Sequence, residues 1–266
     1  MTVALRLIAG DGSALLVEDS GSGTPLVLLH GGLNSTRSFD RILPILTPRY
    51  RCLALGRRGY GQSGAAPGAA HSFDREAQDV ATLLATLDQP AHLFGHSSGA
   101  IAAATAALAA PARVRSLVLY EPPFPIGSPH PDQWLIAAEA AVARGDNEEA
   151  ALIGLRDGVG FPPPLVDRLR ADPTWRERVA AAPAWIRESR SVLSLPVGVA
   201  RLSAISAPTL LLTGSHTEPH HTAAIDALHG VLPDNEVAVL AGQGHTALVS
   251  APDLLGETML AFLDRH

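Results

Sequence analysis

The sequence predicts an α/β fold with a mostly parallel eight-stranded sheet flanked by helices, and two observations lead to this prediction. Short apolar runs of strand length alternate with helix-length segments through most of the 266 residues, which is the pattern of a parallel sheet with crossover helices. The run at 25–29 is continuously apolar, as expected of a strand buried on both faces. Such crossovers are right-handed in nearly all known folds.

The elements follow one another along the chain in a simple order. The glycine-rich turn at 10–13 predicts a hairpin between strands at 3–8 and 15–19. Further strands are expected at 25–29, 51–55, 91–94, 115–120, 208–213 and 236–240. Helices are expected from about 35 to 46 and at 72–87, 98–110 and 252–265, because apolar residues recur there at helical spacing or follow a strand directly.

The alternation stops after Glu121. Helix-like segments then occupy 132–144, 148–158, 165–171, 174–182 and 184–195, and prolines separate several of them, with Pro183 between the last two. Strand-like runs resume only near 208. We therefore expect a core formed by residues 1–121 and 205–266, with residues 122–204 inserted as a helical cap and not as an independent domain.

Composition narrows the possible partners and compartment. The net charge of −6 and the isoelectric point near 6.0 argue against a nucleic-acid or anionic-membrane surface. The single cysteine, Cys52, lies in an apolar run and has no partner for an internal disulfide. No signal-peptide pattern and no apolar stretch of membrane-spanning length is visible. A cytoplasmic protein with a small-molecule substrate is the expectation.

The most informative motif is Gly95-x-Ser97-x-Gly99, between the strand at 91–94 and the helix at 98–110. This is the pattern of a nucleophile elbow, in which a serine sits on a sharp strand-to-helix turn and glycines let neighbouring backbone pass closely. The turn would raise the Ser97 hydroxyl above the sheet edge. It would also place the Ser98 N–H at a positive helix terminus, where an oxyanion can bind. An ordinary structural turn is the alternative.

Four motifs together resemble the α/β-hydrolase superfamily over essentially the whole chain. They are His30-Gly31-Gly32 after a buried strand, the Arg57–Ser63 loop, the serine elbow, and Gly244-His245 near the end. Gly56 departs from the family, which usually has Asp before Arg-x-Gly-x-Gly-x-Ser, but that position supports the loop and not the chemistry. His245 follows the last expected strand, and the resemblance implies that it is the base for Ser97.

The triad's acid has two candidates. The family's usual acid lies after the seventh strand, where this chain has Thr217 in the expected slot and Glu218 one residue further on. Glu121, directly after the sixth strand, is favoured here because a minority of the superfamily takes its acid from that position. A carboxylate there would fix the tautomer of His245 and stabilise its cation.

The sequence also resembles the fungal zearalenone lactonases, a group in which the triad's acid follows the sixth strand. Shared features are the Ser-Ser-Gly-Ala elbow, Gly32-Leu33, Val-Ser-x-Pro-Asp at 249–253, and Pro183-x-Trp185-x-Arg187. The resemblance implies an oxyanion hole formed by the N–H groups of Gly32 and Ser98, and substrate contact by Trp185. Trp134 and Trp175 are better explained as packing within the cap. Differences are His30-Gly31, where the lactonases have Pro-Asp, and His96 in the elbow.

The predicted function is cofactor-independent hydrolysis of a hydrophobic carboxylic ester or lactone through an acyl-enzyme on Ser97. Dehalogenase and epoxide hydrolase chemistry would need Asp at position 97. The alternatives are other reactions of a serine and a histidine on this fold, namely perhydrolysis, C–C bond hydrolysis and hydroxynitrile cleavage. A further alternative is a small-molecule receptor that keeps the triad but turns its ligand over slowly. No metal site is expected, because Thr217 and Pro219 interrupt any helical face formed by His216, Glu218, His220 and His221.

Overall fold

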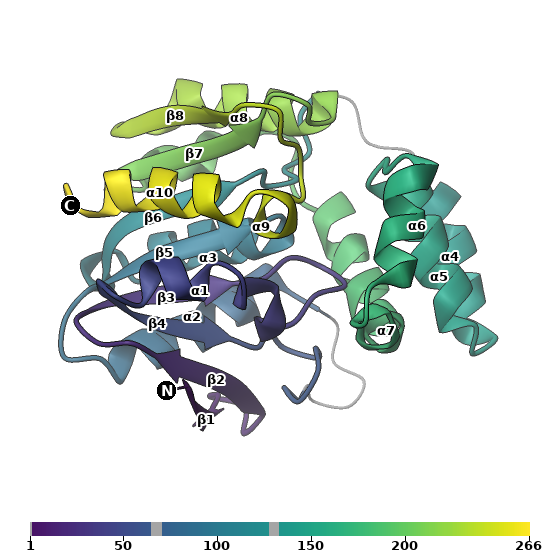
Figure 1. The fold of residues 1–266 in the computed structure, drawn as a ribbon, viewed down its shortest axis with the longest axis horizontal. Helices are drawn as coiled ribbons and strands as arrows, with labels where there is room; N and C mark the ends of the chain where they lie inside the picture. Colours follow the sequence, from purple (N-terminus) through teal and green to yellow (C-terminus); the bar gives the residue numbers. More distant parts are fainter. Residues whose placement is uncertain (1, 65–70, 128–132) are drawn as a thin grey trace.

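The computed structural model describes residues 2–64, 71–127 and 133–266 and has an eight-stranded sheet at its centre (Figure 1). The strands are β1 (Thr2–Ile8), β2 (Ala14–Ser20), β3 (Thr24–Leu29), β4 (Tyr50–Leu55), β5 (Ala91–His96), β6 (Val114–Tyr120), β7 (Thr209–Gly214) and β8 (Asn235–Leu240). Their spatial order is β1-β2-β4-β3-β5-β6-β7-β8. β2 pairs antiparallel with β1 and β4, and the remaining pairs are parallel. The predicted fold class is confirmed.

Helices cover both faces of the sheet. One face packs against α2 (Phe73–Ala85), α3 (Ser98–Ala109) and α8 (Pro219–Val231), and the other against α1 (Leu43–Leu46) and α10 (Pro252–Leu263). Strand β3 explains why both layers are needed: Val27 and Leu29 enter one hydrophobic cluster, while Leu26 and Leu28 enter the other. Each buried aliphatic side chain of this kind contributes about 1.5–3 kcal/mol to folding.

In the described part of the chain, four further helices follow β6 and lie apart from those that flank the sheet (Figure 1). They are α4 (Gln133–Ala143), α5 (Asn147–Ile153), α6 (Pro163–Ala171) and α7 (Trp175–Leu193), with a π turn (Gly154–Gly158) extending α5. We call these four helices the helical layer. The layer has its own hydrophobic cluster, which also takes in Leu33 and Tyr60 from loops at the end of the sheet.

The shorter helical segments complete the fold. They are α9 (Ala247–Ser250) and the 3-10 turns Thr36–Phe39, Pro111–Arg113 and Ala200–Ala204. The helix expected at about 35–46 is therefore a 3-10 turn followed by the single turn α1. Residue 132, where the first cap helix was expected to begin, lies outside the described residues.

Two expectations about helices were wrong. The helix break expected at Pro183 is absent, because α7 runs unbroken from Trp175 to Leu193 with Pro183 inside it. Proline removes one helical hydrogen bond at a cost of about 3 kcal/mol, and burial of Trp185 and Ile186 from the same helix offsets a loss of that size.

The second error concerns the segment after the strand at 208–213, where no helix was expected. His220 and His221 lie in the first turn of α8, which begins at Pro219. The sequence did carry the signal for this helix, because proline favours the first helical position. Buried apolar residues also recur there at helical spacing, namely Ala224, Ile225 and Leu228.

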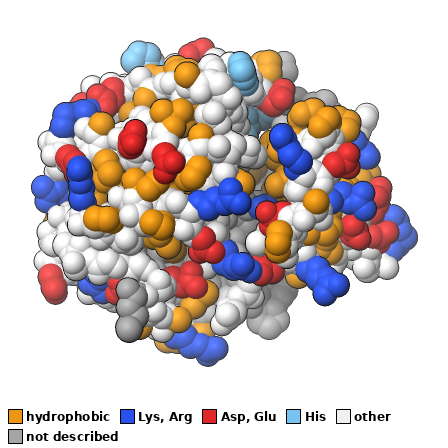
Figure 2. Space-filling view, in the orientation of Figure 1, with side chains coloured by type: hydrophobic (Ala, Val, Ile, Leu, Met, Phe, Trp, Pro, Cys, Tyr) orange, Lys and Arg blue, Asp and Glu red, His pale blue; other side chains and the backbone are white. Residues whose placement is uncertain are grey.

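Every helix among the described residues is too short or too polar to span a lipid bilayer. Acidic and basic side chains are interspersed over the face drawn in Figure 2, between scattered apolar groups.

Candidate active site

The turn around Ser97 is strained, and close packing holds it. Strand β5 ends at His96 and α3 begins at Ser98, which leaves Ser97 between them with φ 55° and ψ −128°. A Cβ on Gly95 would lie 2.5 Å from the Ala100 Cα, and one on Gly99 would lie 2.4 Å from the His30 carbonyl oxygen. Both positions therefore need glycine. The Ser97 N–H donates to the Tyr120 carbonyl at 2.9 Å, and its side chain lines a cavity.

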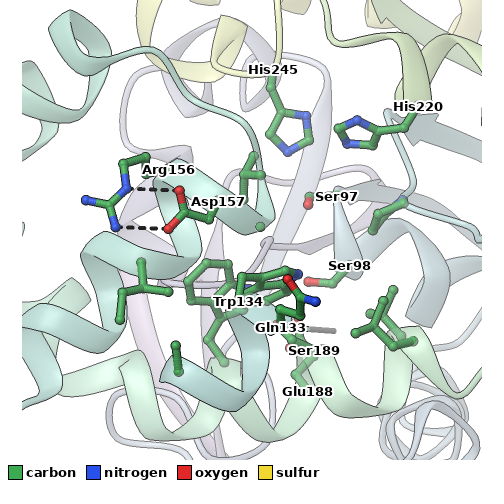
Figure 3. A pocket seen from close by; sticks show the side chains of 18 of the residues that line it. Ser97, Ser98, Gln133, Trp134, Arg156, Asp157, Glu188, Ser189, His220 and His245 are labelled. Atoms are coloured by element: carbon green, nitrogen blue, oxygen red, sulfur yellow. Dashed lines mark hydrogen bonds and ion pairs between the residues drawn. The ribbon is translucent and has the colours of Figure 1, made fainter. Parts of the chain in front are cut away.

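His245 and Glu121 form a hydrogen-bonded pair beside this serine. His245, in the loop between β8 and α9, has its Nδ1 2.7 Å from Glu121 Oε2. Glu121 is fully buried at the end of β6, and its Oε1 accepts hydrogen bonds from the Gly214 N–H at 2.8 Å and the Thr213 hydroxyl at 3.2 Å. The Nδ1 proton thus points to the carboxylate, which leaves Nε2 as the acceptor. Figure 3 shows His245 above Ser97.

Glu121 is held in its ionised form. Burial by itself would raise the pKa of Glu121, but the hydrogen bond and charge of His245, together with the Gly214 N–H, outweigh it and lower this pKa below its ordinary value. Glu218, the alternative acid, is the residue before α8, and its side chain lies next to Gly160. Within the described residues no hydrogen bond joins Glu218 to His245.

Two further histidines contact His245. The His221 ring is stacked on it, with centroids 4.3 Å apart and an interplanar angle of 10°. His96 Nε2–H donates to the His245 carbonyl at 2.9 Å. Burial, followed by the proximity of His245, lowers the pKa of His96 well below its ordinary value, so His96 is a neutral hydrogen-bond donor. These contacts fix both the ring and the backbone of His245.

The loop after β3 runs beside Ser97. A Cβ on Gly31 would lie only 3.0 Å from the Ser97 Cβ, and one on Gly32 would lie 2.1 Å from Cδ1 of the Trp185 indole. Leu33, next in the loop, has φ 54°. Across the turn, Ser98 is the first residue of α3, where the N–H has no acceptor within its own helix. The N–H groups of Gly32 and Ser98 are thus on the two segments that flank the serine.

Sequence reasoning missed a buried ionic network beneath this site. The Arg57 guanidinium donates to Glu76 Oε2 at 2.9 Å, to Glu188 Oε2 at 2.8 Å and to the Ser98 hydroxyl at 3.0 Å. Tyr60 donates to the same Glu188 oxygen at 2.7 Å. Burial would lower the pKa of Arg57, but the charges of Glu188 and Glu76 outweigh it and raise this pKa. One buried cation thus links the β4 loop, α2, α3 and α7.

The cavity over Ser97 has a volume of about 640 Å³ and lies between the sheet edge and the helical layer. Trp185 and Trp134 line it, with ring centroids 6.1 Å apart. Trp175 is not part of the lining, and its indole N–H donates to Glu148 at 3.1 Å. Of the three tryptophans in the sequence, two therefore face the cavity.

Two acid–histidine clusters in the described part of the chain are compact enough to bind a metal ion. They are Glu121-His221-His245 and His71-Glu76-Glu188, each with its ligand atoms within 4.8 Å of one another. In the first, Glu121 and His245 bond to each other; in the second, Arg57 lies against both carboxylates. Protein contacts therefore account for both clusters.

Comparison with known proteins gives a consistent result. Residues 26–258 match the model described as the alpha/beta hydrolase family. The crystal structure of an alpha/beta hydrolase from Sphaerobacter thermophilus superposes with a TM-score of 0.87 at 27% identity, covering 97% of this chain and 100% of that one.

Two curated enzymes are also similar over most of their length. The 2-(acetamidomethylene)succinate hydrolase of Mesorhizobium japonicum is 27% identical over 265 residues, which are 94% of this chain and 91% of that protein. Carboxylesterase YbfK of Bacillus subtilis is 26% identical over 248 residues, which are 90% of this chain and 79% of that protein.

Proposed function

Because the chain belongs to the alpha/beta hydrolase family, we propose that it hydrolyses carboxylic esters or lactones of hydrophobic small molecules through an acyl-enzyme on Ser97. The observation that carries this proposal is the Glu121–His245 pair: buried Glu121 lies 2.7 Å from His245, and His245 lines the same cavity as Ser97. A serine is a weak nucleophile until a base takes its proton, and an oriented imidazole is that base.

The reaction follows from the roles of these groups. His245 Nε2 takes the Ser97 proton as the hydroxyl oxygen attacks the substrate carbonyl carbon. The N–H groups of Gly32 and Ser98 stabilise the negative charge on the carbonyl oxygen. His245 then protonates the departing alkoxide, and in the second half it deprotonates a water molecule that releases the acid from Ser97. Glu121 keeps the Nδ1 proton in place and stabilises the imidazolium.

The cavity supports a hydrophobic substrate. Its walls from the helical layer are mainly apolar, with Trp134, Ile153, Val159, Trp185 and Val192 among them, as is usual for small-molecule sites. On this proposal residues 122–204 act as a cap that supplies the acyl or alcohol pocket, and Trp185 is part of its wall. The similarity to a carboxylesterase favours ester chemistry. Lactones are included because an acyl-enzyme forms equally well from a cyclic ester.

The test is turnover of 4-nitrophenyl acetate, butyrate and octanoate and of an aromatic macrolactone. Wild type should hydrolyse butyrate or octanoate faster than acetate, and Ser97→Ala should lose at least about 100-fold of that activity. The exposed Ser203→Ala is the matched control and should behave as wild type. A fluorophosphonate should phosphonylate wild type and Ser203→Ala, with loss of fluoride and a mass increase equal to the phosphonyl group, but not Ser97→Ala.

Equal turnover by wild type and Ser97→Ala would overturn the proposal. If Ser97 is labelled but no ester or lactone is hydrolysed, the result would instead favour C–C bond hydrolysis, which also depends on the serine. It would equally favour a receptor that binds a small molecule and turns it over slowly. A macrolactone preferred over every linear ester would support the likeness to zearalenone lactonases.

A further inference from the structure

One carboxylate oxygen of Glu188 has no hydrogen-bond partner among the described residues. The residue lies on α7, its side chain is 1% exposed, and its Oε2 accepts hydrogen bonds from Arg57 and Tyr60. Its Oε1 is buried and forms no hydrogen bond within the described residues. Glu188 also lines the cavity that contains Ser97, and Figure 3 shows Ser97 and Ser98 between His245 above and Glu188 below.

An unsatisfied buried acceptor destabilises the free enzyme, and most buried polar atoms have a partner. Because Oε2 already accepts from Arg57 and Tyr60, a cavity-bound molecule that bonds to this carboxylate would do so at Oε1. A carboxylate oxygen only accepts hydrogen bonds. The group that completes this site must therefore be a donor.

Glu76 provides an internal comparison. It is buried to a similar extent and bonds to the same guanidinium, with Oε2 2.9 Å from Arg57 Nε. Its second oxygen is satisfied, because His71 Nε2 lies 2.9 Å from Oε1. Glu76 does not line the cavity over Ser97. Of the two carboxylates, the one with an oxygen that lacks a partner among the described residues thus belongs to the residue that lines the cavity.

The charges along the cavity indicate which donors fit. Among the described residues, three carboxylates line it (Glu149, Asp157 and Glu188), against one guanidinium, Arg156. Arg156 makes a two-point contact with Asp157, at 2.9 Å for each bond (Figure 3). The net negative charge of these side chains would repel a substrate that carries a carboxylate. It would not repel a substrate whose hydrogen-bond donor is neutral or cationic.

We propose that Glu188 is a substrate-binding residue whose Oε1 accepts a hydrogen bond from a hydroxyl or N–H group of the ester. This inference rests on the proposed function and narrows its substrate class to hydrophobic esters or lactones that carry a hydrogen-bond donor and no acid group. The donor lies on the part of the substrate that reaches toward α7, away from His245.

The test compares 4-nitrophenyl 3-phenylpropanoate with its 2-, 3- and 4-hydroxyphenyl and 4-aminophenyl analogues, which share one leaving group. In wild type the best donor analogue should exceed the parent ester in kcat/KM by about 10-fold to 100-fold, the range for a hydrogen bond to a charged group. Comparison of the hydroxyl and amino analogues identifies which donor the site prefers.

Glu188→Gln should abolish this preference. Arg57 and Tyr60 both donate to the Oε2 position, so the carboxamide oxygen should occupy it and place an NH₂ donor where Oε1 was. The ratio of analogue to parent should then fall to about one or below. Glu76→Gln is the matched control: it disturbs the same guanidinium but not the cavity, and the wild-type ratio should remain.

An unchanged ratio in Glu188→Gln, or a wild type that favours the parent over every donor analogue, would overturn the inference. Failure of the proposed function is a separate result, namely loss of Ser97-dependent turnover of the parent ester itself. If Glu188→Gln does not fold, a wild-type comparison of hydroxyphenyl with methoxyphenyl esters still decides, because a methoxy group cannot donate. Equal rates for that pair would contradict the inference.

Discussion

Ser97 and Glu121, at the ends of the neighbouring strands β5 and β6, both have positive backbone φ angles, 55° and 46°. Non-glycine residues adopt such conformations at a cost of about 1–3 kcal/mol each. The Ser97 N–H bonds to the carbonyl of Tyr120, the residue before Glu121, so the two strained residues are connected by one backbone hydrogen bond. Strain is thus concentrated where the chemistry is proposed to occur.

Removing the strain at Ser97 should stabilise the protein and inactivate it. Glycine adopts this φ without strain, so Ser97→Gly should stabilise the folded state. Glycine also makes the unfolded chain more flexible, which opposes this gain. The net increase in the free energy of unfolding should be about 1 kcal/mol. Ser97→Ala keeps the strain and should match wild type in stability, while both variants lose turnover. Urea denaturation measures the difference. Equal stability of the glycine and alanine variants would show that the turn is not strained.

The two candidate acids can be separated by paired substitutions. Glu121→Gln removes the charge that stabilises protonated His245, so kcat should fall by about 10³–10⁴-fold. Glu218→Gln should leave kcat close to the wild-type value, because Glu218 lies next to Gly160 and not on His245. Steady-state kinetics with 4-nitrophenyl butyrate measures both. The reverse pattern would assign the role to Glu218.

A methyl group at position 32 should displace the indole of Trp185. The Cβ would lie 2.1 Å from the ring, so Gly32→Ala should lower the free energy of unfolding by about 1–3 kcal/mol and reduce kcat/KM. In a Trp185→Leu background the same glycine substitution should cost much less, because the indole that the methyl group displaces is gone. Gly10→Ala is the control, because no atom of the described residues other than its chain neighbours lies within 4 Å of the added Cβ. Full stability of Gly32→Ala alone would contradict this packing.

Buried neutral histidines should make the fold sensitive to mild acid. Burial, reinforced by the Arg57 charge, lowers the pKa of His30 to about 3, whereas an unfolded histidine titrates near 6.5. As the pH falls below 6.5, His30 binds a proton in the unfolded state but stays neutral in the folded state. The free energy of unfolding therefore decreases from pH 6.5 down to about 3. The loss for one such residue approaches 1.4 kcal/mol per pH unit.

His30→Asn should therefore flatten the pH dependence of stability between pH 7 and 5, above the range where carboxyl groups titrate. Its Nδ2 can replace the donor to the Gly31 carbonyl, which His30 Nδ1 contacts at 2.8 Å. Urea denaturation at several pH values gives the slope. Identical slopes for variant and wild type would mean that His30 binds its proton equally well in the folded and unfolded states, which would contradict the lowered pKa.

Most of the sheet could be predicted from the sequence, because a strand such as β3 is buried on both faces and shows this as an unbroken apolar run. The elbow was predictable because glycine is required on both sides of Ser97. Helix α8 was missed although Pro219 and its apolar spacing indicated it. Pro183 misled the prediction, since the burial of Trp185 and Ile186 depends on tertiary packing that local sequence does not reveal.

The network around Arg57 could not be predicted in the same way. A buried guanidinium requires carboxylate partners, but Glu188 follows Arg57 by 131 positions, and no spacing rule selects it among the 26 acidic residues. That Oε1 of Glu188 lacks a partner among the described residues follows only from the position of α7 relative to the sheet. The Glu121–His245 contact was a better target for prediction because both residues follow strands that end at one edge.

The hydrophobic cluster of the helical layer includes Leu33 and Tyr60, and this matters for how such enzymes diversify. Helices α4 to α7 cannot be replaced on their own by those of a relative, because they pack against the loops that contain Gly32 and Arg57. A chimera that takes these helices from a relative would need that relative's residues at 33 and 57–60 as well. Recombination within the family should therefore succeed when the crossovers transfer layer and loops together.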